Sequence, residues 1–174
     1  MKIQDTRIKD LKVIIIKKIK DSRGFFSRNF CEKELKLVTK RKIVQSNISF
    51  NKKKFTLRGF HYQKSPSKEG KFITCLKGKI FNVTIDLNKK SKSYLKLFKI
   101  IINSDDNKII YIPPGCANAY LTLEKNTLIN YLMTDFYKPE SYKKFNYKSK
   151  EIKINWPAKP VVISPQDQNA KNLF

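Results

Sequence analysis

Hydrophobic and polar residues alternate along short stretches of this chain, a pattern typical of β-strands. Clusters of Gly, Pro, Asn, Asp and Ser separate these stretches and favour turns. About nine or ten strands are expected, and their even spacing predicts a β-sandwich or a closed barrel. The clearest candidates are 11–17, 43–50, 56–63, 71–76, 79–87, 94–102, 109–112 and 127–133, and a run of small residues at 116–120 leads into another.

Helical periodicity is scarce, and one or two short helices are expected at most. The best candidate is 31–38 (CEKELKLV), while 21–24 (DSRG) has the composition of a turn. Lys77-Gly78 predicts a tight hairpin between the strands on either side of it. No repeat of fixed period is evident, and 174 residues fit one domain, 1–174.

The octapeptide 56–63 (TLRGFHYQ) contains the only histidine of the chain, His61, and one of its five arginines, Arg58. Positions three apart point to opposite sides of a regular strand. Gly59 between them favours a bulge that would aim both side chains into one pocket. The alternative is a strand end with a surface arginine and a hydrogen-bonded histidine, and the octapeptide alone does not decide between them.

The strand expected at 43–50 carries a row of neutral polar side chains on one face. Gln45, Asn47 and Ser49 alternate with the apolar residues of the other face, which are Val44, Ile48 and Phe50. Such a row suits the wall of a sugar-binding site, but any half-buried strand also alternates in this way. Both interpretations stay open on the pattern alone.

The net charge of +24 raises the possibility of a nucleic-acid partner. However, 33 of the 38 basic residues are lysines, and they are spread along the whole chain without a basic tail. Surfaces dedicated to nucleic acids draw heavily on arginine for forked contacts. We therefore expect no nucleic-acid partner, although the positive field would attract a polyanion such as a nucleoside diphosphate.

The three cysteines, Cys31, Cys75 and Cys116, are far apart and include no CxxC pair. They predict neither a disulfide framework nor a zinc site, and a single histidine argues against a transition-metal centre. No stretch has the roughly 20 apolar residues needed to span a bilayer, and no signal peptide is evident. A cytoplasmic protein without a membrane partner is expected.

Eight short motifs follow one another along nearly the whole chain. They are DSRGFF (21–26), QSNIS (45–49), LRGFHYQ (57–63), GK (70–71), YIPPG (111–115), Tyr131 with TDFY (134–137), WP (156–157) and SPQD (164–167). In content and order the series resembles the dTDP-4-dehydrorhamnose 3,5-epimerase family. The resemblance implies an all-β, cupin-type jelly roll. It also implies a homodimer whose N-terminal segments cross to the partner, with no metal and no cofactor.

The resemblance further implies epimerisation of a nucleotide-linked 4-keto-6-deoxy sugar, with dTDP as the expected nucleotide. His61 is the expected base, and Asp167 would bond its far ring nitrogen. Lys71 would stabilise the enolate, and Tyr131 would be the acid on the opposite face. Without the resemblance, Asp167 reads as a loop residue, Tyr131 as a core aromatic and Lys71 as one lysine among 33.

Substrate-binding residues are implied in the same way. Arg23 and Arg58 would hold the diphosphate, and Phe26 and Tyr137 would stack on the base. Gln45, Asn47, Ser49 and Asn118 complete the expected binding set. Three positions depart from the family pattern: Arg28 and Tyr142 replace a common acid, and Asn118 replaces a common histidine. The departures are harmless drift, or they indicate another nucleotide sugar or inversion at one carbon only. Two alternatives for the whole chain stay open: a keto-sugar isomerase of the same fold, and a jelly roll that binds a sugar nucleotide without catalysis.

Overall fold

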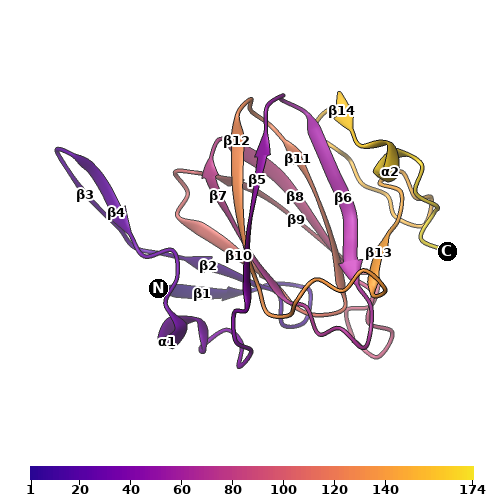
Figure 1. Cartoon of the computed structure of the whole chain (residues 1–174), viewed down its shortest axis with the longest axis horizontal. Helices are drawn as coiled ribbons and strands as arrows, with labels where there is room; N and C mark the ends of the chain where they lie inside the picture. Colours follow the sequence, from indigo (N-terminus) through magenta and orange to yellow (C-terminus); the bar gives the residue numbers. More distant parts are fainter.

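The computed structural model describes residues 1–174, which form two antiparallel sheets packed face to face (Figure 1). The first sheet has the strand order β1-β2-β10-β7-β12-β5. Its strands are β1 (Lys2–Asp5), β2 (Lys12–Ile15), β10 (Lys108–Ile112), β7 (Lys71–Lys77), β12 (Thr127–Met133) and β5 (Gln45–Asn51). The order is far from sequential, so the chain passes repeatedly between the two layers.

The second sheet has the order β13-β6-β11-β8-β9, and β14 pairs in parallel with β6. Its strands are β13 (Tyr142–Lys144), β6 (Thr56–Gln63), β11 (Cys116–Thr122), β8 (Lys79–Asp86), β9 (Leu97–Asn103) and β14 (Val162–Ile163). The helices are two single turns, α1 (Glu32–Leu35) and α2 (Pro165–Gln168). The predicted all-β jelly roll with short helices is confirmed, and no helix is long and apolar enough to cross a bilayer.

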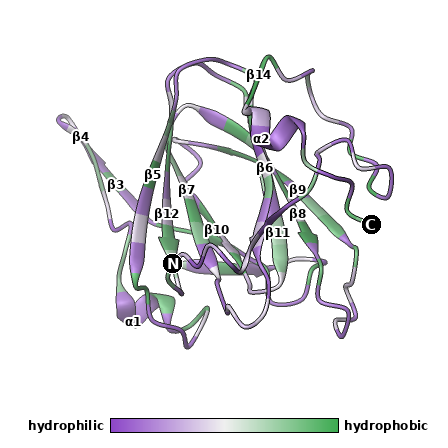
Figure 2. Ribbon diagram, turned by 45° about the vertical axis from the view of Figure 1, so that its right-hand side comes forward, coloured by the Kyte–Doolittle hydropathy of each residue, from purple (hydrophilic) through white to green (hydrophobic).

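The core between the sheets follows from the two-residue period of the strands. Ile73 on β7, Ile110 on β10 and Ile129 on β12 are fully buried against Ile80 and Ile102 of the opposite sheet. Colour by hydropathy alternates along the strands of both layers (Figure 2). Full burial of each such side chain contributes about 1.5–3 kcal/mol, so this layer fixes the strand registers and with them the site described below.

The C-terminal segment covers the outer face of the second sheet. Phe145 stacks on Phe60 of β6 with ring centroids 4.7 Å apart, and Trp156 packs on both Phe60 and Phe81. In Figure 1 this segment lies along the β6 side of the molecule and ends beside α2. The packing returns the last residues of the chain to the strand that carries His61.

A separate hairpin projects from the body of the molecule (Figure 1). It consists of β3 (Lys18–Asp21) and β4 (Gly24–Ser27), with Asp21 paired to Gly24 across the predicted turn. Its apolar side chains are exposed, and Phe26 has 67% of its surface accessible. The sequence pattern does not predict these strands because the hairpin buries no face within its own chain.

Two further predictions need correction. Lys77-Gly78 does not make a hairpin, because β7 and β8 belong to different sheets and the turn carries the chain between them. Gly78 has a φ of +82°, and a Cβ there would lie 2.6 Å from the Thr127 hydroxyl. The number of strands is fourteen rather than nine or ten. The additional ones are two to four residues long, too short for a periodic signal.

Candidate active site

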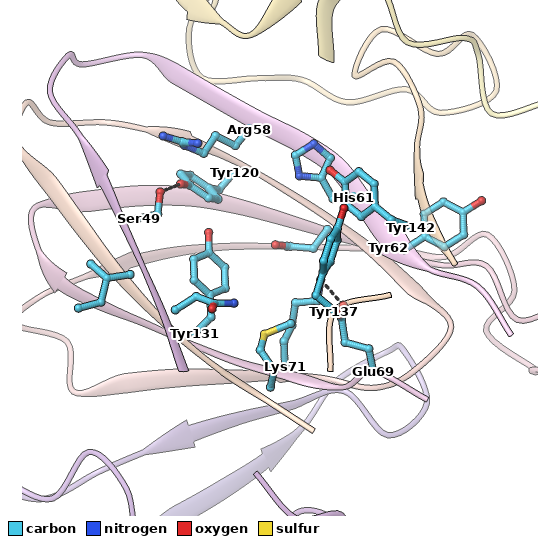
Figure 3. A pocket seen from close by; sticks show the side chains of 14 residues that line it. Ser49, Arg58, His61, Tyr62, Glu69, Lys71, Tyr120, Tyr131, Tyr137 and Tyr142 are labelled. Atoms are coloured by element: carbon cyan, nitrogen blue, oxygen red, sulfur yellow. Dashed lines mark hydrogen bonds and ion pairs between the residues drawn. The ribbon is translucent and has the colours of Figure 1, made fainter. Parts of the chain in front are cut away.

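A cavity of about 290 Å³ opens between the two sheets (Figure 3). Both layers contribute side chains to it, so its shape depends on how the sheets pack. The first sheet provides Asn47, Ile48, Ser49, Lys71, Tyr131 and Met133; the second provides Arg58, His61, Tyr62, Asn118, Tyr120 and Tyr142; loops provide Glu69 and Tyr137.

A bulge in β6 brings Arg58 and His61 to the same cavity. The register pairs Asn118 with His61 and Tyr120 with Arg58, so three steps along β6 match two along β11. Gly59 lies in the extra step with a φ of +119°, and a Cβ there would lie 2.6 Å from the Ala119 backbone. Only glycine fits this close approach, and the predicted convergence of the two side chains is confirmed.

Asp167 binds the His61 ring and fixes its orientation. Its Oδ1 lies 2.7 Å from His61 Nε2, and its Oδ2 accepts a hydrogen bond of 3.2 Å from the Gly59 N–H. Ser164 caps α2 and accepts from the Asp167 N–H at 3.1 Å, which fixes the carboxylate on its turn. Since Asp167 binds Nε2–H, the lone pair at Nδ1 is the one available to act as a base.

Asp167 is only 5% exposed, and its pKa reflects two opposing effects. Burial raises the pKa of the carboxyl, but the hydrogen bond and charge of His61 and the Gly59 and Ser164 contacts together leave it below the usual 3.8. The carboxylate is therefore ionised at neutral pH, where it can stabilise a protonated His61.

Lys71 stands at the start of β7 beside a second buried carboxylate. Its Nζ lies 2.9 Å from Glu69 Oε1, and both side chains are buried. Glu69 Oε2 in turn accepts a hydrogen bond of 2.6 Å from Gln63 Nε2. The pair is electrically balanced, and the contact holds the ammonium in place at the cavity wall.

Tyr131 faces His61 across the cavity, since the first lies on β12 of one sheet and the second on β6 of the other. Burial raises the pKa of Tyr131 well above 10, and the neighbouring Tyr120 adds to the effect. The Tyr120 hydroxyl lies 3.0 Å from Ser49 Oγ (Figure 3). Tyr131 is therefore protonated at neutral pH and can act as an acid.

Arg58 supplies a positive charge that no carboxylate of the chain balances. Its Nε donates to Asn51 Oδ1 at 2.9 Å, and its exposed guanidinium borders the cavity. Asn118 donates both amide hydrogens inward, to Asn82 Oδ1 at 2.7 Å and to the Val83 carbonyl at 3.0 Å. Its Oδ1 remains as an acceptor at the cavity wall.

Tyr137 and Tyr142 form an aromatic edge to the cavity, with their ring centroids 5.7 Å apart and their planes at 63°. The ring of Tyr142 also lies 5.5 Å from that of His61. Burial raises the pKa of Tyr142, and the Asp167 charge raises it further. This side chain therefore stays neutral where the family pattern commonly has an acid.

Three predicted binding residues lie outside the cavity of their own chain. Arg23 and Phe26 are on the projecting β3–β4 hairpin, where Arg23 pairs with Asp21. Gln45 supports the cavity edge instead of lining it. Its Nε2 donates to Asn47 Oδ1, and its Oε1 accepts from the Tyr137 N–H. Arg28 pairs with Glu34 near α1, also away from the cavity.

Six lining residues carry no predicted role at the site in the sequence analysis: Ile48, Tyr62, Glu69, Tyr120, Met133 and Tyr142. Tyr120 follows Asn118 at the strand period, which is the one local signal that could have indicated it. Glu69 lies in a loop, and its partners Gln63 and Lys71 meet it only in the folded chain.

The arrangement suits proton transfer next to a carbonyl group. A histidine with an ionised carboxylate behind it faces a protonated tyrosine across a gap, and an ammonium group lies at the wall. A base removes the acidic proton, a cation stabilises the enolate, and an acid returns a proton from the other side.

Comparison with known proteins identifies the family. The family model described as dTDP-4-dehydrorhamnose 3,5-epimerase matches residues 5–174. The dTDP-4-dehydrorhamnose 3,5-epimerase of Sinorhizobium fredii is 32% identical over 175 aligned residues, which cover 99% of this chain and 90% of the relative.

Solved structures of relatives superpose closely. The Bacillus anthracis dTDP-4-dehydrorhamnose 3,5-epimerase, solved with TDP and pyrophosphate, has a TM-score of 0.95 at 29% identity and 99% coverage of both chains. The Legionella pneumophila dTDP-6-deoxy-D-glucose-3,5-epimerase, solved with dTDP-4-keto-L-rhamnose, has a TM-score of 0.92 at 33% identity, covering 98% of this chain and 92% of that one. The chain therefore belongs to the dTDP-4-dehydrorhamnose 3,5-epimerase family and is an epimerase of that class.

Proposed function

We propose that this chain, acting as one domain over 1–174, inverts C3 and C5 of dTDP-4-dehydro-6-deoxyglucose to give dTDP-4-dehydrorhamnose. The observation that carries the proposal is the placement of the His61–Asp167 pair opposite Tyr131 across one cavity. The Legionella relative, whose structure contains dTDP-4-keto-L-rhamnose, supports the choice of sugar and nucleotide.

The first step is proton removal by His61. Nδ1 takes the hydrogen from the carbon next to the C4 ketone, and the electrons of the broken C–H bond move to the carbonyl oxygen. The resulting enolate carries its negative charge near the Lys71 ammonium, which Glu69 holds in place. Asp167 stabilises the imidazolium formed in this step.

The second step is protonation from the opposite face by Tyr131. Its O–H bond breaks, the carbon takes the proton, and the carbonyl forms again. In the starting sugar the hydrogens on C3 and C5 lie on the same face of the ring. One base and one opposed acid can therefore serve both carbons in turn.

The remaining lining residues hold the substrate. Arg58 is the unbalanced cation for the diphosphate, because a guanidinium forks onto phosphate oxygens. Asn118 accepts a hydrogen bond from a sugar hydroxyl through its free Oδ1. Asn47 and Ser49 contribute further polar contacts, Gln45 orients Asn47, and Tyr137 stacks on the base.

A homodimer would complete the site. The β3–β4 hairpin projects from its own chain with exposed aromatic residues, and β5 at the sheet edge exposes Ile48 to 68%. Exposed apolar surface of this kind is typical of a protein interface. In such a dimer Arg23 of the partner subunit would reach the diphosphate, and Phe26 of the partner subunit would reach the base.

The test is uptake of solvent deuterium by dTDP-4-dehydro-6-deoxyglucose in D₂O. The wild-type protein is expected to label C3 and C5, and His61→Ala is expected to slow labelling by about 10²–10⁴-fold, because the base is gone. A reaction without protein corrects for spontaneous exchange, and dTDP binding with a thermal melt shows that the variant is folded. Wild-type labelling rates in His61→Ala would overturn the proposal, and labelling of one carbon alone would reduce it to a single-carbon epimerase.

A further inference from the structure

The acid Tyr131 must regain a proton after each transfer. Inversion of both C3 and C5 in one binding event consumes two protons on the Tyr131 side. In the proposed reaction the sugar ring lies between His61 and Tyr131, where it would block direct access of water from the cavity. A second route for the proton is therefore needed beside the tyrosine, along the cavity wall.

The structure contains a line of hydroxyl groups in that position. The Tyr131 hydroxyl points toward Tyr120 (Figure 3), and the Tyr120 hydroxyl lies 3.0 Å from Ser49 Oγ. Tyr120 is only 2% exposed, whereas Ser49 is half-buried on β5, the edge strand of the first sheet. Tyr120 and Ser49 both line the cavity, so the line runs along the cavity wall from Tyr131 to the edge strand.

Neighbouring groups orient this line. Asn51 Oδ1 accepts from Arg58 Nε at 2.9 Å and lies 3.4 Å from the Tyr120 hydroxyl. Burial and Tyr120 raise the pKa of Tyr131, and the charge of Arg58 opposes them. Arg58 is therefore the neighbour that favours the phenolate awaiting a proton.

We propose that Tyr120 and Ser49 form a hydroxyl relay that returns a proton to Tyr131 while the sugar still occupies the cavity. The inference rests on the role given to Tyr131 in the proposed function. The Tyr131 phenolate takes the Tyr120 proton, Tyr120 takes the Ser49 proton, and Ser49 takes one from solvent. Three O–H bonds form within the relay, and the net change is the uptake of one solvent proton.

The relay predicts a specific effect of Tyr120→Phe, which removes one oxygen and keeps the ring. Transfer of the first proton is expected to be nearly unchanged, because Tyr131 starts the event protonated. The second inversion is expected to slow by about tenfold or more, since general-acid steps contribute 10²–10⁴-fold. Singly inverted sugar would then accumulate. Ser49→Ala is expected to shift the products in the same direction.

The experiment is a single turnover with enzyme in excess, stopped at intervals by reduction of the ketone, with singly and doubly inverted sugars quantified. Tyr147→Phe is the control, since it removes a hydroxyl from a buried residue whose ring packs on Trp156 away from the cavity. A higher share of singly inverted sugar in Tyr120→Phe and Ser49→Ala, but not in Tyr147→Phe, is the expected result.

Measurement of Tyr131→Phe in parallel distinguishes failure of the relay from failure of the proposed role of Tyr131. Impaired inversion in Tyr131→Phe, together with a wild-type product ratio in both Tyr120→Phe and Ser49→Ala, would overturn the relay and leave the proposed function intact. Wild-type inversion in Tyr131→Phe would overturn the acid assignment and the relay with it.

Discussion

The side chain of His61 is held by a carboxylate from the far end of the chain. Asp167 reaches it because the C-terminal segment packs over β6 and because Ser164 caps the single turn that carries the carboxylate. Gly59 fixes the second oxygen through its N–H. At the scale of single residues, the site is a base whose tautomer and orientation are set by these three contacts.

Asp167→Asn is expected to lower kcat by about 10²–10⁴-fold with little change in KM, because the amide no longer fixes the reactive tautomer or stabilises the imidazolium. Steady-state kinetics across pH 5–9 measure the effect, and the exposed Asp105→Asn is the matched control. A kcat within twofold of the wild type would show that Asp167 does not act through His61.

Asp135 contributes to stability in a pH-dependent way. It accepts hydrogen bonds from the Lys68 N–H, the Ser67 hydroxyl and the Lys138 ammonium, and these contacts lower its pKa to about 2. The lowered pKa stabilises the fold above about pH 4, and this contribution fades as the pH falls toward 2.

Asp135→Asn is expected to reduce the free energy of unfolding at pH 7 by about 1–2 kcal/mol, a range that allows for partial screening by solvent. Urea unfolding at pH 7 and at pH 2.5 measures the difference, which should shrink at the lower pH. An equal difference at both values would mean that the carboxylate charge plays no part.

The residue types in the sequence predicted part of the site and gave little indication of the rest. The lone histidine and the glycine two positions before it predicted the convergence of Arg58 and His61, which the register confirms. Pairing with Asp167 across more than a hundred positions was implied only by the family resemblance. Glu69 was missed because it lies in a loop without periodicity, and Tyr120 because only its spacing from Asn118 indicates it.

At the scale of elements, β6 organises the site. It pairs with β11, β13 and β14, it carries Arg58 and His61 on the two sides of its bulge, and its Phe60 anchors the C-terminal segment. The sequence predicted the bounds of β6 and β12 because both have long periodic patterns. It did not predict the β3–β4 hairpin, whose apolar side chains remain exposed in the single chain.

Gly59→Ala is expected to destabilise the protein by about 3 kcal/mol or more, because the new Cβ meets the β11 backbone and the φ of +119° is strained for alanine. Gly115→Ala is the matched control. Its φ is +85°, but its Cβ meets only ordinary contact at 3.5 Å, so a cost of about 1–2 kcal/mol is expected. Thermal and urea unfolding compare the two, and equal losses would contradict the close approach of β6 and β11.

At the scale of the whole molecule, most of the exposed large apolar side chains lie in the N-terminal part of the chain. The hairpin and the exposed face of β5 present aromatic and aliphatic side chains, and the remaining surface is rich in lysine. The net charge of +24 suits a dianionic diphosphate substrate but does not select it. Selection depends on the cavity between the sheets.

The proposed dimer is tested by mixing two inactive proteins. His61→Ala keeps an intact hairpin, and Arg23→Ala/Phe26→Ala keeps an intact cavity. If the hairpin serves the partner, random mixed dimers have one working site each, and about a quarter of wild-type activity returns after co-refolding. No recovery from a mixture that sedimentation shows to be dimeric would contradict the crossing of the hairpin.

The opposed positions of His61 and Tyr131 are the central claim, and Tyr131→Phe tests them most directly. With the base intact and the acid removed, His61 still takes a proton and returns a solvent deuteron to the same face. The account predicts continued deuterium uptake at C3 and C5 in D₂O while inversion falls by about 10²–10⁴-fold. Inversion at the wild-type rate, or a parallel loss of uptake and inversion, would contradict it.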